Sequence, residues 1–124
     1  MTHLDTNFLI SRLVPNSPQA ILLRKWLATE PVALSAIVWT EFLCGPVNNE
    51  QIAKAAQLFP APEPFLSQDS TVAANWFNRT GRRRGSLVDC MIAAVAFRSG
   101  ARLATENVSD FQPFVAHGLK LVSA

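Results

Sequence analysis

The chain has 124 residues, of which 49% are hydrophobic and 16% are charged, and its formal net charge at pH 7 is +2. This length predicts a single domain over residues 1–124, and the apolar content excludes a disordered chain. The longest apolar runs are far too short to cross a membrane, and Asp5 interrupts the first of the apolar stretches. We therefore expect no signal peptide and a cytoplasmic protein.

Short apolar segments alternate with helical patterns in the first half of the chain. Residues 2–5 predict a buried strand, and residues 6–14 predict a turn into a helix that Pro15 ends. The next three segments predict, in chain order, a helix over 17–30, a strand over 32–35, and a helix over 36–45 with Ser35 as its N-cap.

The same alternation continues in the second half. The segments first predict a helix over 49–59, a loop at the "PAPEP" of 60–64 and a helix over 67–80. After the basic loop "GRRRG" of 81–85, they predict a fully buried helix over 87–100 with Ser86 as its cap. Strands are predicted over 101–105 and 119–123. Strands that alternate with helices predict an α/β fold, with a mainly parallel central sheet flanked by helices. Functional sites in such folds lie at the carboxyl ends of the strands.

Cysteine, histidine and tryptophan residues suggest packing more than chemistry. Cys44 and Cys90 lie in apolar segments without the spacing of metal ligands, so we expect both to be reduced and buried. We expect His3 and His117 to be ordinary residues. The tryptophans fall on apolar helical faces, which favours packing in the core or at an interface over base stacking: Trp26, Trp39 and Trp76.

Four of the nine acidic residues map to one region of the predicted fold. Asp5 ends the first strand, Asp89 lies in the first turn of the buried helix, and Asp110 follows the strand over 101–105. Glu41 lies in the middle of its helix, where its side chain can point into the space between helix and sheet. Because the carboxyl ends of parallel strands share an edge, we expect these carboxylates to lie close together.

Each acid also has a structural interpretation. Ser86 and Asp89 have the spacing of a capping box, Asn107 and Asp110 have the same spacing, Asp5 can start a turn, and Glu41 can lie on an exposed helix face. Taken together, the four carboxylates would repel one another, and a divalent cation would remove that penalty. No histidine or cysteine lies nearby in a ligand pattern, so Mg²⁺ or Mn²⁺ is favoured over zinc.

Four segments in order carry a resemblance that covers nearly the whole chain: "HLDTNFLI", "SAIVWTEFLCG", "RRRGSLVDCMIAA" and "LATENVSDF". Together they resemble the acidic motifs of the PIN-domain nucleases, and specifically the VapC-type toxins of prokaryotic toxin–antitoxin pairs. The resemblance implies a PIN-like three-layer domain. It places Asp5, Glu41, Asp89 and Asp110 in the catalytic and metal-binding set, and Asn107 competes with Asp110 for the fourth position. The supporting polar residues that it implies are Thr6, Asn7, Ser86, Thr105 and Asn107.

The activity that this resemblance implies is a metal-dependent endoribonuclease. Mg²⁺ or Mn²⁺ held by Asp5, Asp89 and Glu41 would activate water for attack on an RNA phosphodiester bond, and Asp110 would bind a second ion or orient the water. The resemblance also implies a homodimer and a cognate antitoxin protein. Charge and position also favour RNA-phosphate contacts by the basic loop over the alternative of a merely solvated loop. The residues concerned are Arg82, Arg83 and Arg84.

Two other functions remain open at this point. The first is a PIN-like protein that binds RNA or a partner without cutting, and the intact acids argue against it. The second is a phosphotransfer domain with Asp5 as covalent nucleophile. That chemistry usually needs a second acid two residues later, where this chain has Asn7, or a late lysine, for which only Lys120 is available.

Overall fold

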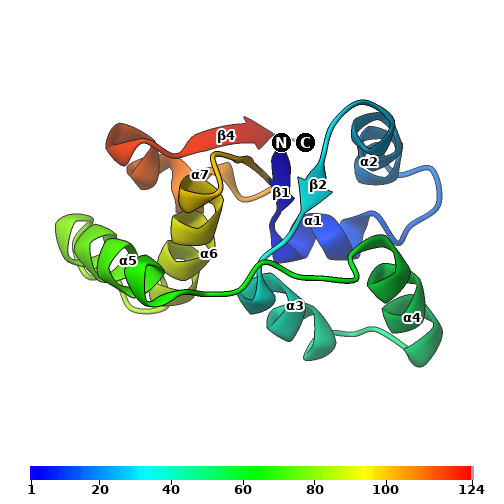
Figure 1. The fold of residues 1–124 in the computed structure, drawn as a ribbon, viewed down its shortest axis with the longest axis horizontal. Coiled ribbons are helices and arrows are strands. Elements are labelled where there is room, and N and C mark those ends of the chain that lie inside the picture. The colour runs from blue at the N-terminus through cyan, green and yellow to red at the C-terminus, as the bar shows by residue number, and fades with distance from the viewer. Residues whose placement is uncertain (124) are drawn as a thin grey trace.

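The computed structural model describes residues 1–123, which form one central sheet and its surrounding helices (Figure 1). The elements, in chain order, are β1 (Thr2–Leu4), α1 (Thr6–Ser11), α2 (Pro18–Thr29), β2 (Val32–Ala33), α3 (Ala36–Leu43), α4 (Asn49–Leu58), α5 (Ser67–Arg79), α6 (Leu87–Arg98), β3 (Arg102–Thr105), α7 (Val108–Phe111), the 3₁₀ helix η1 (Gln112–His117) and β4 (Lys120–Ser123).

The sheet has four strands in the order β2-β1-β3-β4, and every neighbouring pair is parallel. Strand β1 lies inside the sheet, where Thr2 is opposite Val32 of β2 and Arg102 of β3. All three residues of β1 are buried, as expected for a parallel strand that is covered on both faces. The predicted α/β class, a parallel sheet flanked by helices, is confirmed.

Aromatic pairs fill the core beside the sheet. Trp26 of α2 stacks on Phe8 of α1 with ring centroids 5.4 Å apart. Trp76 of α5 packs against Phe97 and Phe114 at centroid distances of 5.3 and 5.6 Å. Helices α5 and α6 therefore form one packed unit on the side of the molecule opposite α4 (Figure 1). The remaining tryptophan, Trp39, is partly buried and stacks on Phe42 at 5.5 Å.

Side-chain caps explain where several helices begin. The hydroxyl of Ser17 accepts from the amide of Ala20, with Pro18 at the first helical position, and Ser35 caps α3 in the same way. Asn48 and Gln51 form a reciprocal capping box at α4. The start signals at Ser17 and Ser35 are confirmed, and the Asn48 cap is a further one that the sequence analysis did not predict.

The cap predicted for α6 is wrong in its chemistry. Ser86 is the N-cap residue, but its hydroxyl makes no cap hydrogen bond and instead donates to the carbonyl oxygen of Arg83 at 2.7 Å. Helix α6 is also less buried than predicted, because Leu87, Val88 and Phe97 are exposed at its two ends. Cys44 is a further correction: Cys90 is buried, but Cys44 is exposed just after α3.

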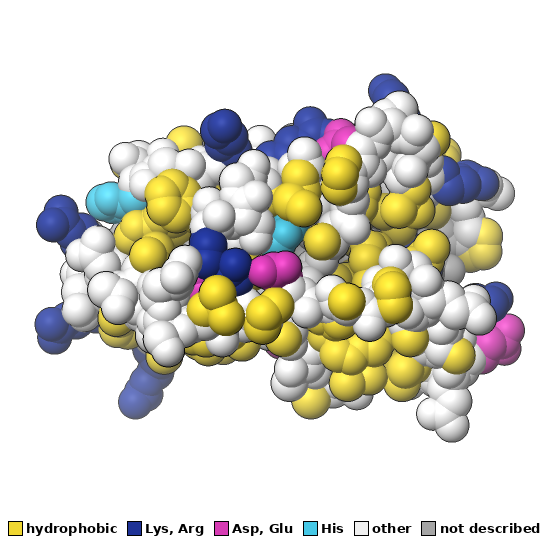
Figure 2. Space-filling model, in the orientation of Figure 1, with side chains coloured by type: hydrophobic (Ala, Val, Ile, Leu, Met, Phe, Trp, Pro, Cys, Tyr) yellow, Lys and Arg dark blue, Asp and Glu magenta, His cyan; other side chains and the backbone are white. Residues whose placement is uncertain are grey.

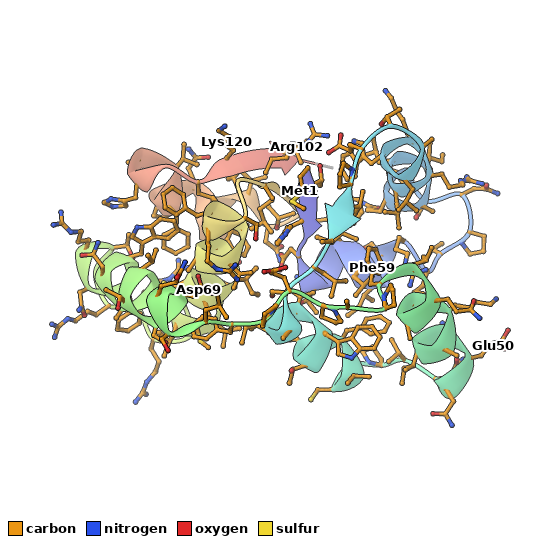
Figure 3. The ribbon with its side chains drawn as sticks, in the orientation of Figure 1. Met1, Glu50, Phe59, Asp69, Arg102 and Lys120 are labelled. Atoms are coloured by element: carbon orange, nitrogen blue, oxygen red, sulfur yellow. The ribbon has the colours of Figure 1, made fainter. Side chains whose placement is uncertain are left out.

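A network of ionic contacts fastens the loop before α5 to α6. The Arg98 guanidinium donates to both carboxylate oxygens of Asp69 at 2.8 and 3.0 Å and to Glu63 at 3.0 Å. Asp69 is 1% exposed and also accepts from the amide of Leu66 (Figure 3). Nothing in the spacing of these residues along the sequence pointed to this network.

The same loop extends the sheet by a single bridge. The amide of Glu63 donates to the carbonyl of Leu34, and the amide of Ala36 donates to the carbonyl of Glu63, both at 2.8 Å.

None of the helices described for residues 1–123 has the length and apolar character needed to cross a lipid bilayer.

Candidate active site

Asp5 lies where β1 ends, and both of its carboxylate oxygens are engaged. One oxygen accepts from the amide of Thr6 at 2.7 Å and makes Asp5 the N-cap of α1. The other accepts from the hydroxyl of Thr105, at the end of β3, at 2.9 Å. Asp5 is 5% exposed, and burial raises its pKa, an effect that these two hydrogen bonds oppose.

Thr105 organises the end of β3 around this carboxylate. Its hydroxyl also accepts from the amide of Asn107 at 2.9 Å, which fixes the turn that leads into α7. Asn107 is the N-cap residue of α7, but its side chain makes no cap hydrogen bond. The Asn107–Asp110 cap considered from the spacing is therefore absent as a side-chain interaction, and only the Asp110 amide bonds the Asn107 carbonyl, at 3.0 Å.

Glu41 approaches the same end of the sheet from α3. Its carboxylate accepts from the hydroxyl of Thr6 at 2.6 Å, so a side chain from the first turn of α1 holds it. Glu41 is exposed, which means that it lies at the mouth of the site and not in the space between helix and sheet. Asn7 beside Thr6 is also exposed.

Asp89 is partly buried in the first turn of α6, and the shift in its pKa identifies the charged residues near it. Burial and the nearby charges of Asp5, Asp110 and Glu41 raise the pKa of Asp89 to about 6, and Arg83 opposes that shift. A carboxyl group whose pKa is raised by three other acids must lie within their electrostatic range. The four candidate acids therefore share one region.

Arg83 supplies a contact that the sequence did not predict. Its Nη2 lies 3.5 Å from a carboxylate oxygen of Asp110, which joins the basic loop to the acid after β3. Arg82 and Arg84 are exposed and form no ion pair within residues 1–123. Of the three arginines predicted to contact RNA, one thus already has an acidic partner inside the chain.

The donor set fits a hard divalent cation by chemistry and by charge. The candidate ligands are carboxylates, and both the burial and the repulsion that raise the pKa of Asp89 are penalties that such an ion relieves. Within residues 1–123, however, no three His, Cys, Asp or Glu side chains are gathered closely enough to hold a metal ion. Asp110 faces Arg83, and hydroxyl groups hold Asp5 and Glu41, so side chains would have to turn for all four acids to reach one ion.

A comparison with family models agrees with this parallel sheet and the acids near its carboxyl edge. The PIN domain model matches residues 3–112, and the chain belongs to the PIN domain family. No curated protein sequence matches the chain.

Among solved structures, the chain is similar to a toxin–antitoxin complex from Klebsiella pneumoniae, with 21% identity, a TM-score of 0.74, and coverage of 98% of this chain and 96% of the other. It is similar to VapBC-1 from nontypeable Haemophilus influenzae, with 27% identity, a TM-score of 0.70 and the same coverage. It is also similar to VapC20 of Mycobacterium tuberculosis, described as a toxin that cleaves the sarcin–ricin loop, with 19% identity, a TM-score of 0.65, and coverage of 96% of both chains.

Proposed function

We propose that this chain is a metal-dependent endoribonuclease and the toxin of a toxin–antitoxin pair. The observation that carries the proposal is the placement of four carboxylates near one edge of the sheet, where burial and the charges of the other three raise the pKa of Asp89 to about 6. Such a concentration of negative charge beside an RNA-binding surface needs a cation. Membership of the PIN domain family and the similarity to a toxin that cleaves RNA support the same activity.

Each residue has a defined part in this proposal. Asp5, Asp89 and Glu41 would hold Mg²⁺ or Mn²⁺, and Asp110 would join them or orient the attacking water. When bound, the metal lowers the pKa of a coordinated water and neutralises charge on the scissile phosphate. Thr105 fixes the carboxylate of Asp5 in one orientation.

The remaining polar groups serve the same reaction. Thr6 holds Glu41 at the mouth of the site. The arginines of the basic loop lie just before the N-terminus of α6, so they would attract the RNA backbone toward an edge that would otherwise repel it.

A cognate antitoxin and a second copy of the chain are the expected protein partners. The antitoxin follows from the likeness to solved toxin–antitoxin complexes. For the homodimer, an apolar surface at the start of α5 and α6 supplies a candidate interface, which we call the α5–α6 patch. It combines exposed leucine and valine side chains with a groove of about 170 Å³, and its members are Phe65, Leu66, Leu87, Val88 and Met91.

The first test is the effect of Mn²⁺ on the stability of the partner-free protein. Wild type, Asp89→Asn and the control Glu50→Gln should be unfolded thermally with 1 mM Mn²⁺ and with a chelator. Ligand that exceeds its Kd by ten- to a hundredfold stabilises the folded state by roughly 1–3 kcal/mol. We expect that gain for wild type and for Glu50→Gln, whose substitution lies on an exposed face of α4, and no gain for Asp89→Asn.

A second measurement separates a nuclease from a protein that only binds. Total RNA incubated with Mn²⁺ and wild type should acquire new 5′-phosphate ends at discrete positions, and Asp89→Asn should produce none. Stabilisation by Mn²⁺ without new ends, across RNA from several sources, would favour the regulator that binds without cutting. Absence of stabilisation in wild type would remove the metal site itself.

A further inference from the structure

The backbone of Arg83 is tied to the helix that carries Asp89. The amide and the hydroxyl of Ser86 both donate to the carbonyl oxygen of Arg83, at 3.0 and 2.7 Å. Residues 81, 82 and 85 have positive φ angles, so the chain turns sharply on both sides of Arg83. This geometry anchors the main chain at one point while the long side chain extends away from it.

The Arg83 side chain is the local counter-charge of the acidic edge. It reaches Asp110 at 3.5 Å, and it is the only cation among the groups that shift the pKa of Asp89. Hydroxyl groups, which carry no charge, hold Asp5 and Glu41. Arg83 is therefore the one positive charge, among residues 1–123, that offsets part of the negative charge of the four acids.

The contact between Arg83 and Asp110 is of a kind that exchanges easily. The Arg83 side chain is 60% exposed and that of Asp110 is 42% exposed, so water screens the pair. A phosphodiester group offers the same guanidinium two oxygens in the fork geometry that it prefers. The two residues also line a shallow cavity of about 60 Å³ at Pro113, beside which a phosphate oxygen can approach the Arg83 guanidinium.

We propose that Arg83 is a positioning residue that changes partners, pairing with Asp110 in the RNA-free protein and with a backbone phosphate in the RNA complex. Release of Asp110 then completes the acidic set, so RNA and the divalent cation bind with positive coupling. This inference rests on the proposed function, because it takes the acidic edge as the metal site. Coupling between two ligands is reciprocal, which means that metal must strengthen RNA binding by the same factor.

Removal of Arg83 should imitate the effect of RNA on metal affinity. We would titrate Mn²⁺ calorimetrically into RNA-free wild type, Arg83→Gln and Arg84→Gln, after confirming by thermal unfolding that all three fold. Loss of an exposed ion pair predicts a Kd for Mn²⁺ roughly two- to fivefold lower in Arg83→Gln. Arg84→Gln removes the same charge from the same loop but no ion pair, and its Kd should stay close to that of wild type.

A second titration measures the coupling itself. A 2′-O-methyl RNA oligonucleotide, at a concentration that saturates each protein and checked for integrity afterwards, should lower the Kd for Mn²⁺ of wild type and of Arg84→Gln, even though Arg84→Gln binds the oligonucleotide itself less tightly. The same oligonucleotide should have a clearly smaller effect on Arg83→Gln, in which Asp110 is already released. Equal Mn²⁺ affinities for Arg83→Gln and Arg84→Gln, or equal coupling in all three proteins, would overturn the exchange.

The failure of this inference is distinguishable from failure of the proposed function. If wild type binds Mn²⁺ and Arg83→Gln behaves as Arg84→Gln does, the metal site stands and the exchange by Arg83 is wrong. If none of the three proteins binds Mn²⁺, with or without the oligonucleotide, both proposals fall together. Binding by Arg83→Gln alone in the absence of RNA would support the exchange strongly.

Discussion

Two single residues titrate away from their ordinary values, and their effects on stability have opposite signs. The pKa of Asp89 is raised from 3.8 to about 6 by burial and by three neighbouring acids. The pKa of His3 is lowered from 6.5 to about 4, chiefly by burial, and Arg98 and the N-terminal amine add to this while Glu63 opposes it. Each residue therefore makes the folding free energy depend on pH between about 4 and 6.5.

Substitution of Asp89 by asparagine should stabilise the metal-free protein at neutral pH. Between pH 3.8 and about 6 the unfolded chain loses the Asp89 proton more readily than the folded chain, so stability falls as pH rises through this window. Asp89→Asn removes that loss, which we expect to amount to roughly 1–2 kcal/mol at pH 7 after allowance for screening by solvent. Urea unfolding at pH 4.5 and 7.5 with a chelator present measures it. A variant that is less stable than wild type at pH 7.5 would contradict the assignment.

Substitution of His3 by leucine should protect the protein against mild acid. His3 is 2% exposed and its Nε2 has no hydrogen-bond partner, so a leucine of similar volume loses no polar contact at that atom. In wild type, protonation of the unfolded chain removes about 2–3 kcal/mol of stability as pH falls from 6.5 to about 4. The difference in unfolding free energy between His3→Leu and wild type should grow across that range. Parallel curves would show that His3 does not titrate there.

Among the elements, α5 has a buried charge in its first turn. Asp69 is almost completely buried and accepts hydrogen bonds from Arg98 and from the amide of Leu66. Asp69→Ala leaves the guanidinium without its main partner and should cost about 3–4 kcal/mol in unfolding free energy. The matched control is Glu50→Ala, which breaks an exposed pair with Lys54 on α4 and should cost less than about 0.5 kcal/mol. A loss below about 1 kcal/mol for Asp69→Ala would show that the network is dispensable.

The elements were predicted well because their signals are local. Apolar periodicity and the caps at Ser17 and Ser35 lie within one or two helical turns of the structure they specify. The prediction for Ser86 failed because the loop before it turns back through positive φ angles and offers a competing acceptor, the carbonyl of Arg83. Such competition depends on the path of the chain and not on spacing in the sequence.

The sequence predicted that four acids would lie near one edge of the sheet, but not which groups contact them, and their role in a metal site stays a prediction. Parallel strands end at a common edge, and the pKa of Asp89, which is raised by burial and by the charges of the other three acids, agrees with that placement. Their partners join distant parts of the chain: Thr105 to Asp5 across 100 positions and Thr6 to Glu41 across 35. Hydrogen bonds from hydroxyl groups between residues so far apart in the chain produce no spacing pattern that a single sequence could show.

At the scale of the whole molecule, the surface carries apolar side chains that a single copy leaves in water. Figure 2 shows hydrophobic groups gathered over the central and lower part of one face, with most lysine and arginine groups toward its margin. The α5–α6 patch adds leucine and valine residues that are 38–47% exposed. The groove joins the patch members Phe65, Leu87 and Met91, and exposed apolar surface of this kind is typical of an interface.

A charge placed in the α5–α6 patch should therefore separate the proposed homodimer. Leu66→Glu should yield monomers in sedimentation velocity at concentrations where wild type is dimeric, because burial of an unpaired carboxylate opposes association. Val14→Glu is the control, since Val14 is 60% exposed and follows α1, away from the patch. Dimers of both variants would place the interface elsewhere, and a monomeric wild type would remove the homodimer.

The position of β1 inside the sheet also sets the order in which the chain can become active. Asp5 belongs to the first strand, but its hydroxyl partner ends β3, and Asp110 follows β3. A chain emerging from the ribosome therefore carries Asp5 and Glu41, and later Asp89, before the strand β3 that brings the set together has been made. Non-local parallel pairing is also slow to form. If the chain is the toxin we propose, its topology delays assembly of the active site until β3 and Asp110 have been made, and that delay gives a cognate antitoxin time to bind before RNA can be cleaved.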